Sequence, residues 1–158
     1  MHEIRLIEGA PVVELPVKLA MVASRFNGLI VEPMVTACVD TLQRCRVAEN
    51  DLTLVRVPGA RELPLAVKRL AAANRYDAII ALGAVVRGAT PHFEYVAGAC
   101  SQALAALAID HDLPIIFGIV TADSMEQALE RAGGKLGNRG ADAALSALEM
   151  VSLMRKLK

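Results

Sequence analysis

The chain has 158 residues, enough for one domain with a core of its own, and no shift in composition suggests two domains. Seventeen basic and 17 acidic residues give a formal net charge of zero, which provides no electrostatic attraction for nucleic acid or an anionic membrane. Apolar residues make up 54% of the chain but aromatic residues only 3%, so the excess is mostly Ala, Val, Leu and Ile. We therefore expect one domain over residues 1–158, with part of its apolar surface buried against other subunits.

Three cysteines, Cys38, Cys45 and Cys100, form neither a CxxC pair nor a zinc-like cluster with the histidines. We interpret them as reduced thiols in apolar surroundings, as is usual in a cytoplasm. The charged start, residues 1–5, lacks the apolar stretch of a signal peptide, and no run reaches the length of a membrane span. The sequence thus predicts a cytoplasmic protein without a metal site, a membrane contact or a nucleic-acid partner.

In the first half of the chain, two strand-like runs are each followed by a helical pattern. In chain order, the predicted elements are a strand at 17–23, a helix at 31–45, a strand at 52–57 and a helix at 63–74. Pro33 and Pro64 fall in the first turns of these helices, where a missing N–H is tolerated. Residues 1–12 lack a clear pattern and are predicted to be a tail or an added edge strand.

The second half of the chain repeats this alternation. In chain order, the predicted elements are a strand at 78–86, a helix at 96–107, a strand at 114–120, a helix that begins at Ser124 and a helix at 141–157. The run at 78–86 is continuously apolar, as is typical of a strand covered on both faces. Four successive βα units predict an α/β/α sandwich of three layers with a four-stranded parallel sheet, similar to flavodoxin.

In such a sheet, the loops that follow the strands emerge along one edge. The segments placed there are Phe26-Asn27, Gly59–Glu62, Gly88–His92 and Thr121–Asp123. Together they bring an aromatic ring, a carboxylate, backbone donors, a hydroxyl and an imidazole, which suit phosphate binding and proton transfer. The GxxxxGK[ST] and GxGxxG motifs are absent, and no serine occupies a nucleophile elbow, so we expect neither a nucleotide triphosphate, nor NAD, nor acyl-enzyme chemistry.

Several of these candidates also have a purely structural interpretation. Phe26 could be a core aromatic, Glu62 a first-turn carboxylate favoured by the helix dipole, and Thr90 an N-cap for the helix that follows. Arg131 and Lys135 could be cations at a helix C-terminus or, between glycines, part of an anion site. Spacing alone leaves these alternatives open.

Five blocks, in this order, resemble the lumazine synthase family of riboflavin biosynthesis. They are Ser24–Asn27, Val55–Ala60 with Glu62–Pro64, Gly83–Tyr95, Ile116–Gly118, and Glu126–Gly133 with Lys135, Gly137-Asn138 and Gly140. The resemblance implies condensation of 5-amino-6-(D-ribitylamino)uracil with 3,4-dihydroxy-2-butanone 4-phosphate through a Schiff base, with loss of phosphate and water. The product implied is 6,7-dimethyl-8-ribityllumazine, and neither a metal nor a cofactor is needed.

The resemblance also implies roles for individual residues. The residues matching those that contact the pyrimidine substrate are Phe26, Ala60, Arg61, Glu62, Ala84, Val85 and Val86. Ala89 and Thr90 match the residues that bind the butanone phosphate, and His92 matches the proton donor. Phe117 and Arg131 match residues that a neighbouring subunit contributes, the arginine to phosphate.

One position departs from the family's usual pattern. Arg61 stands where an apolar or aromatic residue is common, beside Glu62, which is implied to accept hydrogen bonds from the ribityl hydroxyls. A non-catalytic flavin- or lumazine-binding shell protein on the same fold is therefore the alternative to the enzyme, and a flavodoxin-like FMN carrier is a third, weaker one. The resemblance further implies a homopentamer, and the short turn Gly133–Gly140 resembles that of members that form icosahedral shells. Its implied partners are the small-molecule substrates and riboflavin synthase.

Overall fold

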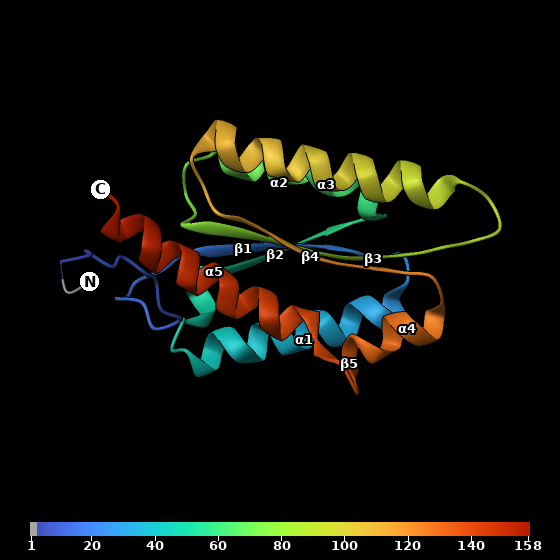
Figure 1. Cartoon of the computed structure of the whole chain (residues 1–158), viewed down its shortest axis with the longest axis horizontal. Helices are drawn as coiled ribbons and strands as arrows, with labels where there is room; N and C mark the ends of the chain where they lie inside the picture. Colours follow the sequence, from blue (N-terminus) through green and yellow to red (C-terminus); the bar gives the residue numbers. More distant parts are fainter. Residues whose placement is uncertain (1–2) are drawn as a thin grey trace.

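A computed structural model describes residues 3–158, in which helices cover both faces of a parallel sheet (Figure 1). The sheet has four strands in the order β2-β1-β3-β4, and each neighbouring pair is parallel. These strands are β1 (Leu19–Ser24), β2 (Leu52–Val57), β3 (Ala78–Val86) and β4 (Ile115–Ala122). The predicted flavodoxin-like sandwich with a four-stranded parallel sheet is confirmed.

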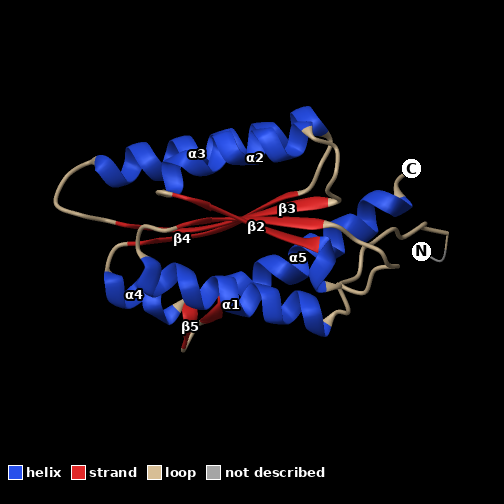
Figure 2. Ribbon diagram, turned by 180° about the vertical axis from the view of Figure 1, so that it is seen from behind, coloured by secondary structure: helices blue, strands red, loops and turns tan. Residues whose placement is uncertain are grey.

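The helices divide between the two faces of the sheet, as both directions of view show (Figure 1, Figure 2). One face carries α1 (Gly28–Arg44), α4 (Met125–Glu130) and α5 (Arg139–Lys156), and the other carries α2 (Leu63–Ala72) and α3 (His92–His111). Two short 3-10 turns, η1 (Glu49–Asp51) and η2 (Ala60–Glu62), precede β2 and α2. Within residues 3–158, no helix has both the length and the hydropathy needed to cross a bilayer.

The central strands β1 and β3 are buried on both faces, which explains their continuous apolar runs. On β1, Met21 packs in the layer with α1 and α5, whereas Val22 packs in the layer with α2 and α3. The edge strands β2 and β4 are more open, and Leu54 and Phe117 on them are partly exposed. Two core layers thus fix the sheet from both sides and hold the carboxyl ends of its strands in place.

Several boundaries lie outside the predicted ranges; for example, β1 ends at Ser24 and α1 begins at Gly28. α3 begins at His92 rather than near Val96, β4 ends at Ala122, and α5 begins at Arg139. Apolar periodicity marks only the buried residues of an element, so an exposed first turn carries no such signal. The correction matters most for α3, because it places His92 on the first turn of the helix itself.

Polar side chains cap the last two helices. The Ser124 hydroxyl accepts a hydrogen bond from the first turn of α4 (3.1 Å), which confirms the predicted helix start. The glycine-rich segment that follows forms a short antiparallel hairpin, β5 (Ala132–Gly134) and β6 (Gly137–Asn138), where the sequence predicted only a turn. At the end of this hairpin, the Asn138 side chain accepts hydrogen bonds from the first N–H groups of α5, at 2.8 and 3.2 Å.

The N-terminal segment lies beside α5 (Figure 1). Residues 3–18 contain no strand, so within one chain this segment adds no edge strand to the sheet. Carbonyl groups of this segment accept hydrogen bonds from side chains of α5 rather than from a neighbouring strand. Lys156 donates to the Glu8 carbonyl (2.8 Å), and Arg155 donates to the Glu14 carbonyl (2.7 Å). Residues 1–2 of the predicted tail lie outside the described residues.

Gly140 is located where α5 meets α1. A Cβ atom at this position would lie 1.9 Å from the carbonyl oxygen of Met34, a backbone atom that cannot swing aside. We expect Gly140→Ala to lower the free energy of unfolding by about 1–3 kcal/mol or more, because the two helices must move apart. Urea denaturation measures this loss. Gly28→Ala is the matched control, since a Cβ there meets no atom within 4 Å, and equal midpoints for both variants would contradict the close approach.

Because two thiols are buried, we expect the free energy of unfolding to depend on pH in the alkaline range. All three cysteines are free; Cys38 and Cys100 are buried and Cys45 is half-buried. Burial raises the pKa of the Cys38 thiol from 9.0 to about 12, and that of Cys100 to about 11. The unfolded chain therefore releases these protons first, so stability is full below about pH 9 and declines as the pH rises toward the folded values.

The expected decline is at most about 1.4 kcal/mol per pH unit for each thiol. Urea unfolding of the wild type and of Cys38→Ala between pH 8 and pH 11 measures it. The Cys38→Ala variant should lose stability less steeply, and parallel slopes would show that Cys38 is not responsible.

Candidate active site

The strand order creates a crevice at one edge of the sheet. From β1 the chain passes to β2 on one side, and then returns to place β3 on the other side of β1. In open parallel sheets, ligands bind where the carboxyl ends of two such strands separate. The structure has a cleft of about 220 Å³ at this point. Its lining residues are Phe26, Asn27, Gly59, Ala60, Arg61, Glu62, Ala84, Val85, Val86, His92 and Val96.

Phe26 reaches the cleft through the turn that follows β1. Its N–H donates to the Pro58 carbonyl (2.9 Å), so the pairing between β1 and β2 continues beyond the strands. Asn27 then adopts a left-handed conformation (φ 60°), and its side-chain amide donates to the Ala84 carbonyl (3.1 Å). This turn directs the chain into α1 and leaves the Phe26 side chain 70% exposed, so its interpretation as a core aromatic is wrong.

The turn between β2 and α2 brings three residues to the opposite wall. The Cys100 thiol on α3 donates to the Ala60 carbonyl (3.4 Å) and so holds the turn against that helix. Glu62 stands at the N-cap of α2, but its carboxylate makes no capping hydrogen bond. Instead, Glu62 lines the cleft, with one carboxylate oxygen 3.1 Å from where a Cβ on Gly59 would lie. A side chain at Gly59 would therefore press on this carboxylate.

Arg61 also lines the cleft and is exposed. Its guanidinium forms no ion pair with any side chain in residues 3–158. The side chain therefore offers a free positive charge to the cleft, next to the carboxylate of Glu62.

The end of β3 offers backbone groups to the cleft. The ladder between β1 and β3 stops at Ala23 opposite Leu82, whereas β3 continues to Val86, which is paired with β4 on its other side. Residues 84–86 therefore extend past the end of β1 with one strand edge toward the crevice, where the Asn27 side chain occupies the Ala84 carbonyl. Unpaired N–H and C=O groups of this kind can bind the flat edge of a heterocycle.

His92 lines the cleft from the first turn of α3. Ala89 and Thr90 are exposed in the loop just before it, outside the lining of the cleft. Pro91 occupies the N-cap of α3 and no side chain caps this helix, so the interpretation of Thr90 as an N-cap is wrong. The loop thus presents its hydroxyl and backbone groups beside the cleft.

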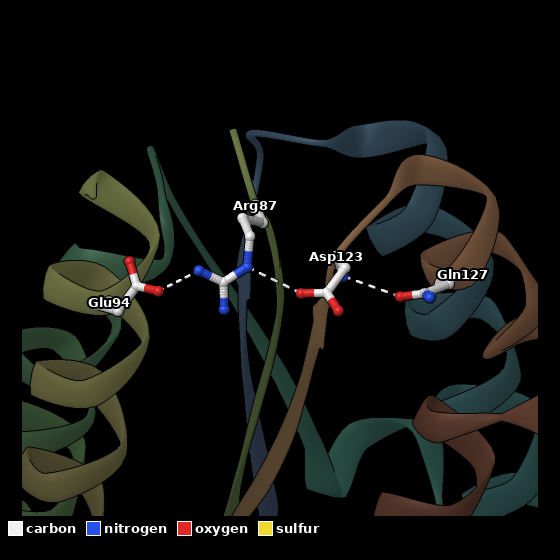
Figure 3. A network of polar contacts seen from close by, with 4 residues as sticks. All are labelled: Arg87, Glu94, Asp123 and Gln127. Atoms are coloured by element: carbon white, nitrogen blue, oxygen red, sulfur yellow. Dashed lines mark hydrogen bonds and ion pairs between the residues drawn. The ribbon is translucent and has the colours of Figure 1, made fainter. Parts of the chain in front are cut away.

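A network of polar side chains lies around this loop (Figure 3). The guanidinium of Arg87 donates to the carboxylates of Glu94, on α3, and of Asp123, after β4, the latter at 2.9 Å. The Arg87 hydrogen bond lowers the pKa of the Glu94 carboxyl, and those to Asp123 and Glu94 raise the pKa of Arg87. Arg87 and Glu94 therefore both stay charged near neutral pH.

Phe117 and Arg131 lie away from the cleft. Phe117 is on the edge strand β4 opposite Ala81, and lines a separate hollow that also contains Arg139. The Arg139 N–H in turn donates to the Arg131 carbonyl (2.9 Å). Arg131 also donates to the Gln127 carbonyl (2.8 Å) at the end of α4, as its interpretation as a helix-terminal cation expects. The cleft of one chain therefore lacks both residues.

Sequence reasoning placed Asn27 and Gly59 in the loops at this edge of the sheet and Val96 on the helix that follows, but gave none of them a role in the site. Asn27 carried a usable signal, because an asparagine before glycine at the end of a strand favours a left-handed turn. The ion pairs of Arg87 carried no such sequence signal, because Glu94 and Asp123 come from separate elements.

Within residues 3–158, no group of three or more His, Cys, Asp or Glu side chains is arranged to hold a metal ion. A family model described as 6,7-dimethyl-8-ribityllumazine synthase matches residues 16–155, which include the four strands of the sheet and all the residues that line the cleft. The match supports a transferase of riboflavin biosynthesis, with lumazine synthase or a closely related activity. With this match over most of its length, the chain belongs to the 6,7-dimethyl-8-ribityllumazine synthase family.

Proposed function

We propose that this protein catalyses the condensation of 5-amino-6-(D-ribitylamino)uracil with 3,4-dihydroxy-2-butanone 4-phosphate to 6,7-dimethyl-8-ribityllumazine. The observation that carries the proposal is the cleft at the ends of β1, β2 and β3. It joins an exposed aromatic ring, a free strand edge, a carboxylate and an imidazole within about 220 Å³, in a chain of this family.

The cleft suits the pyrimidine substrate. The Phe26 ring is exposed and can stack on the flat uracil, an arrangement favoured by offset aromatic packing. The free edge of residues 84–86 can meet the uracil's amide groups with backbone hydrogen bonds. Glu62, Arg61 and Ala60 then lie on the wall that receives the ribityl chain, and the carboxylate of Glu62 accepts hydrogen bonds from its hydroxyls.

The butanone phosphate binds beside the first substrate. Gly88, Ala89 and Thr90 supply N–H groups and a hydroxyl next to the start of α3, where both the donors and the helix dipole favour an anion. Arg131 of a neighbouring subunit completes the phosphate site, because a guanidinium matches the geometry of phosphate oxygens. Phe117 of that subunit closes the pyrimidine side.

The reaction moves a proton at each stage. The 5-amino group attacks the ketone carbon and water leaves to give the Schiff base; loss of the proton at C3 then breaks the C4–O bond and releases phosphate. The resulting enol becomes a ketone at C3, which the ribityl-bearing nitrogen attacks, and a second loss of water closes the ring. His92 gives and takes these protons, as an imidazole can near neutral pH.

We further propose that residues 1–158 form one domain that assembles into a homopentamer, and that pentamers form an icosahedral shell. Supporting this, Leu65, Tyr95 and Ile109 expose large apolar surfaces on α2 and α3 of the single chain, at 65%, 69% and 83%. Riboflavin synthase, which uses the lumazine product, is the proposed partner. Native mass measurement of a free pentamer alone would rule out the shell.

The two-substrate assay tests the proposal. The purified protein, mixed with both substrates, should form the lumazine chromophore far faster than the uncatalysed reaction, and Arg61→Phe should retain turnover. A rate no greater than the uncatalysed one would reject the enzyme.

A second candidate, a flavin- or lumazine-binding shell protein without turnover, is favoured by one observation. Arg61 places an unpaired positive charge in the cleft, which fits a flavin with a phosphate at the end of its ribityl chain. This candidate predicts that FMN binds more tightly than riboflavin, that Arg61→Phe removes the difference, and that both substrates together give no product above background.

A further inference from the structure

Arg87 makes contacts in three directions from the loop that links β3 to α3. Its guanidinium donates to Glu94 on one side and to Asp123 on the other (Figure 3). Its central carbon also lies 4.3 Å from the centre of the Phe93 ring. Two carboxylates and an aromatic face thus converge on one side chain. Only the planar guanidinium has enough donors, in a fixed fork, to serve both carboxylates while stacking on a ring.

The far ends of this network are themselves held in place. The Asp123 N–H donates to the side chain of Gln127 (2.9 Å), which ties the carboxylate to the start of α4. The Arg87 N–H donates to the Ala122 carbonyl (2.8 Å) and so extends the ladder between β3 and β4 by one bond. Arg87 is therefore fixed both by its backbone and by a carboxylate on the neighbouring loop.

The segment between Arg87 and Glu94 contains Ala89, Thr90 and His92, the groups proposed to bind phosphate and move protons. The ion pair between Arg87 and Glu94 closes this segment at both ends, and the contact with Phe93 fixes the residue after the histidine. By contrast, neither Thr90 nor His92 has a side-chain hydrogen bond of its own within residues 3–158. Their positions thus depend on how the ends of the segment are held.

We propose that Arg87 is a positioning residue of the reaction: through Glu94, Phe93 and Asp123 it holds the phosphate-binding loop and His92 in place without touching substrate. The inference rests on the proposed function and assigns Arg87 to one half of the site. It concerns the butanone phosphate and proton transfer, whereas the pyrimidine is bound by Phe26, Glu62 and residues 84–86. Loss of Arg87 should therefore affect one substrate and not the other.

Steady-state kinetics of Arg87→Gln and Arg87→Lys test this separation. For Arg87→Gln we expect the KM for the butanone phosphate to rise about 10-fold or more and kcat to fall by a similar factor, since small misplacements of reacting groups are costly. The KM for the pyrimidine should stay within about 2-fold. Arg87→Lys should recover only part of the loss, because an ammonium cannot serve both carboxylates and the ring.

Arg44→Gln is the matched control. It removes another exposed arginine that pairs with a carboxylate, Asp40, but on α1 and outside the cleft. Hydrogen exchange followed by mass spectrometry adds a readout independent of activity: Arg87→Gln should speed exchange in residues 88–93, and Arg44→Gln should not.

The inference is overturned if Arg87→Gln matches Arg44→Gln in both KM values, kcat and exchange. It is also overturned if both KM values rise together with a general loss of stability, which would indicate a structural role. A wild type that forms no lumazine would instead reject the proposed function, while the exchange experiment would still test whether Arg87 orders the loop.

Discussion

Replacing His92 by alanine is expected to lower kcat by about 10²-fold, the lower end of what general acid–base groups contribute. The proposed reaction needs a proton at each loss of water and at the departure of phosphate. Among the residues that line the cleft, His92 is the one whose side-chain type exchanges protons near neutral pH. The KM of both substrates should change little, because the phosphate loop and the pyrimidine wall remain in place.

Two further variants make this result specific. His92→Gln keeps a polar side chain of similar size but cannot shuttle protons, so it should be as slow as His92→Ala. His111→Ala changes the histidine at the opposite end of α3 and should leave the rate of lumazine formation unchanged. The chromophore assay measures the rate of lumazine formation for His92→Ala, His92→Gln and His111→Ala. Turnover by His92→Ala equal to that of the wild type would remove His92 from the proposed mechanism.

The parallel sheet was predictable from sequence because its signals are local. The run 78–86 is apolar at every position, as a strand buried on both faces requires, and the structure buries it on both faces. Ser124 likewise predicted the start of a helix, and in the structure its hydroxyl caps that helix. The grouping of Phe26, Glu62 and His92 followed from topology alone, since loops after parallel strands share an edge.

Other features depend on contacts that a pattern cannot record. The first turn of α3 is exposed, so apolar spacing located the helix only from Val96 onward. Arg87 meets Asp123 across two loops, and no local signal pairs two exposed charges so far apart in sequence. Phe117 and Arg131 were assigned to a neighbouring subunit by resemblance, and the structure places both away from the cleft of their own chain.

If the active site uses Arg131 of the neighbouring subunit, two variants that are each inactive should complement one another in a mixed assembly. A site built from one chain would not allow this. The His92→Ala chain keeps Arg131, and the Arg131→Ala chain keeps the whole cleft, yet each alone should be nearly inactive. When the two are combined in one assembly, some clefts with His92 will face a neighbour with Arg131. Random mixing in equal amounts should restore about a quarter of the wild-type sites, because each of the two positions is filled correctly half of the time.

Unfolding the two variants together in urea and refolding them as a mixture, followed by the lumazine assay, measures this recovery. The expected activity is about one quarter of that of wild type treated in the same way. Variants refolded separately and mixed afterwards are the control, and should stay near their own low rates as long as subunits do not exchange. If co-refolding restores nothing although mixed assemblies are detected by native mass measurement, Arg131 does not act across the interface. Recovery near one quarter would establish at once that the cleft is half of a site and that the phosphate end is supplied by the partner.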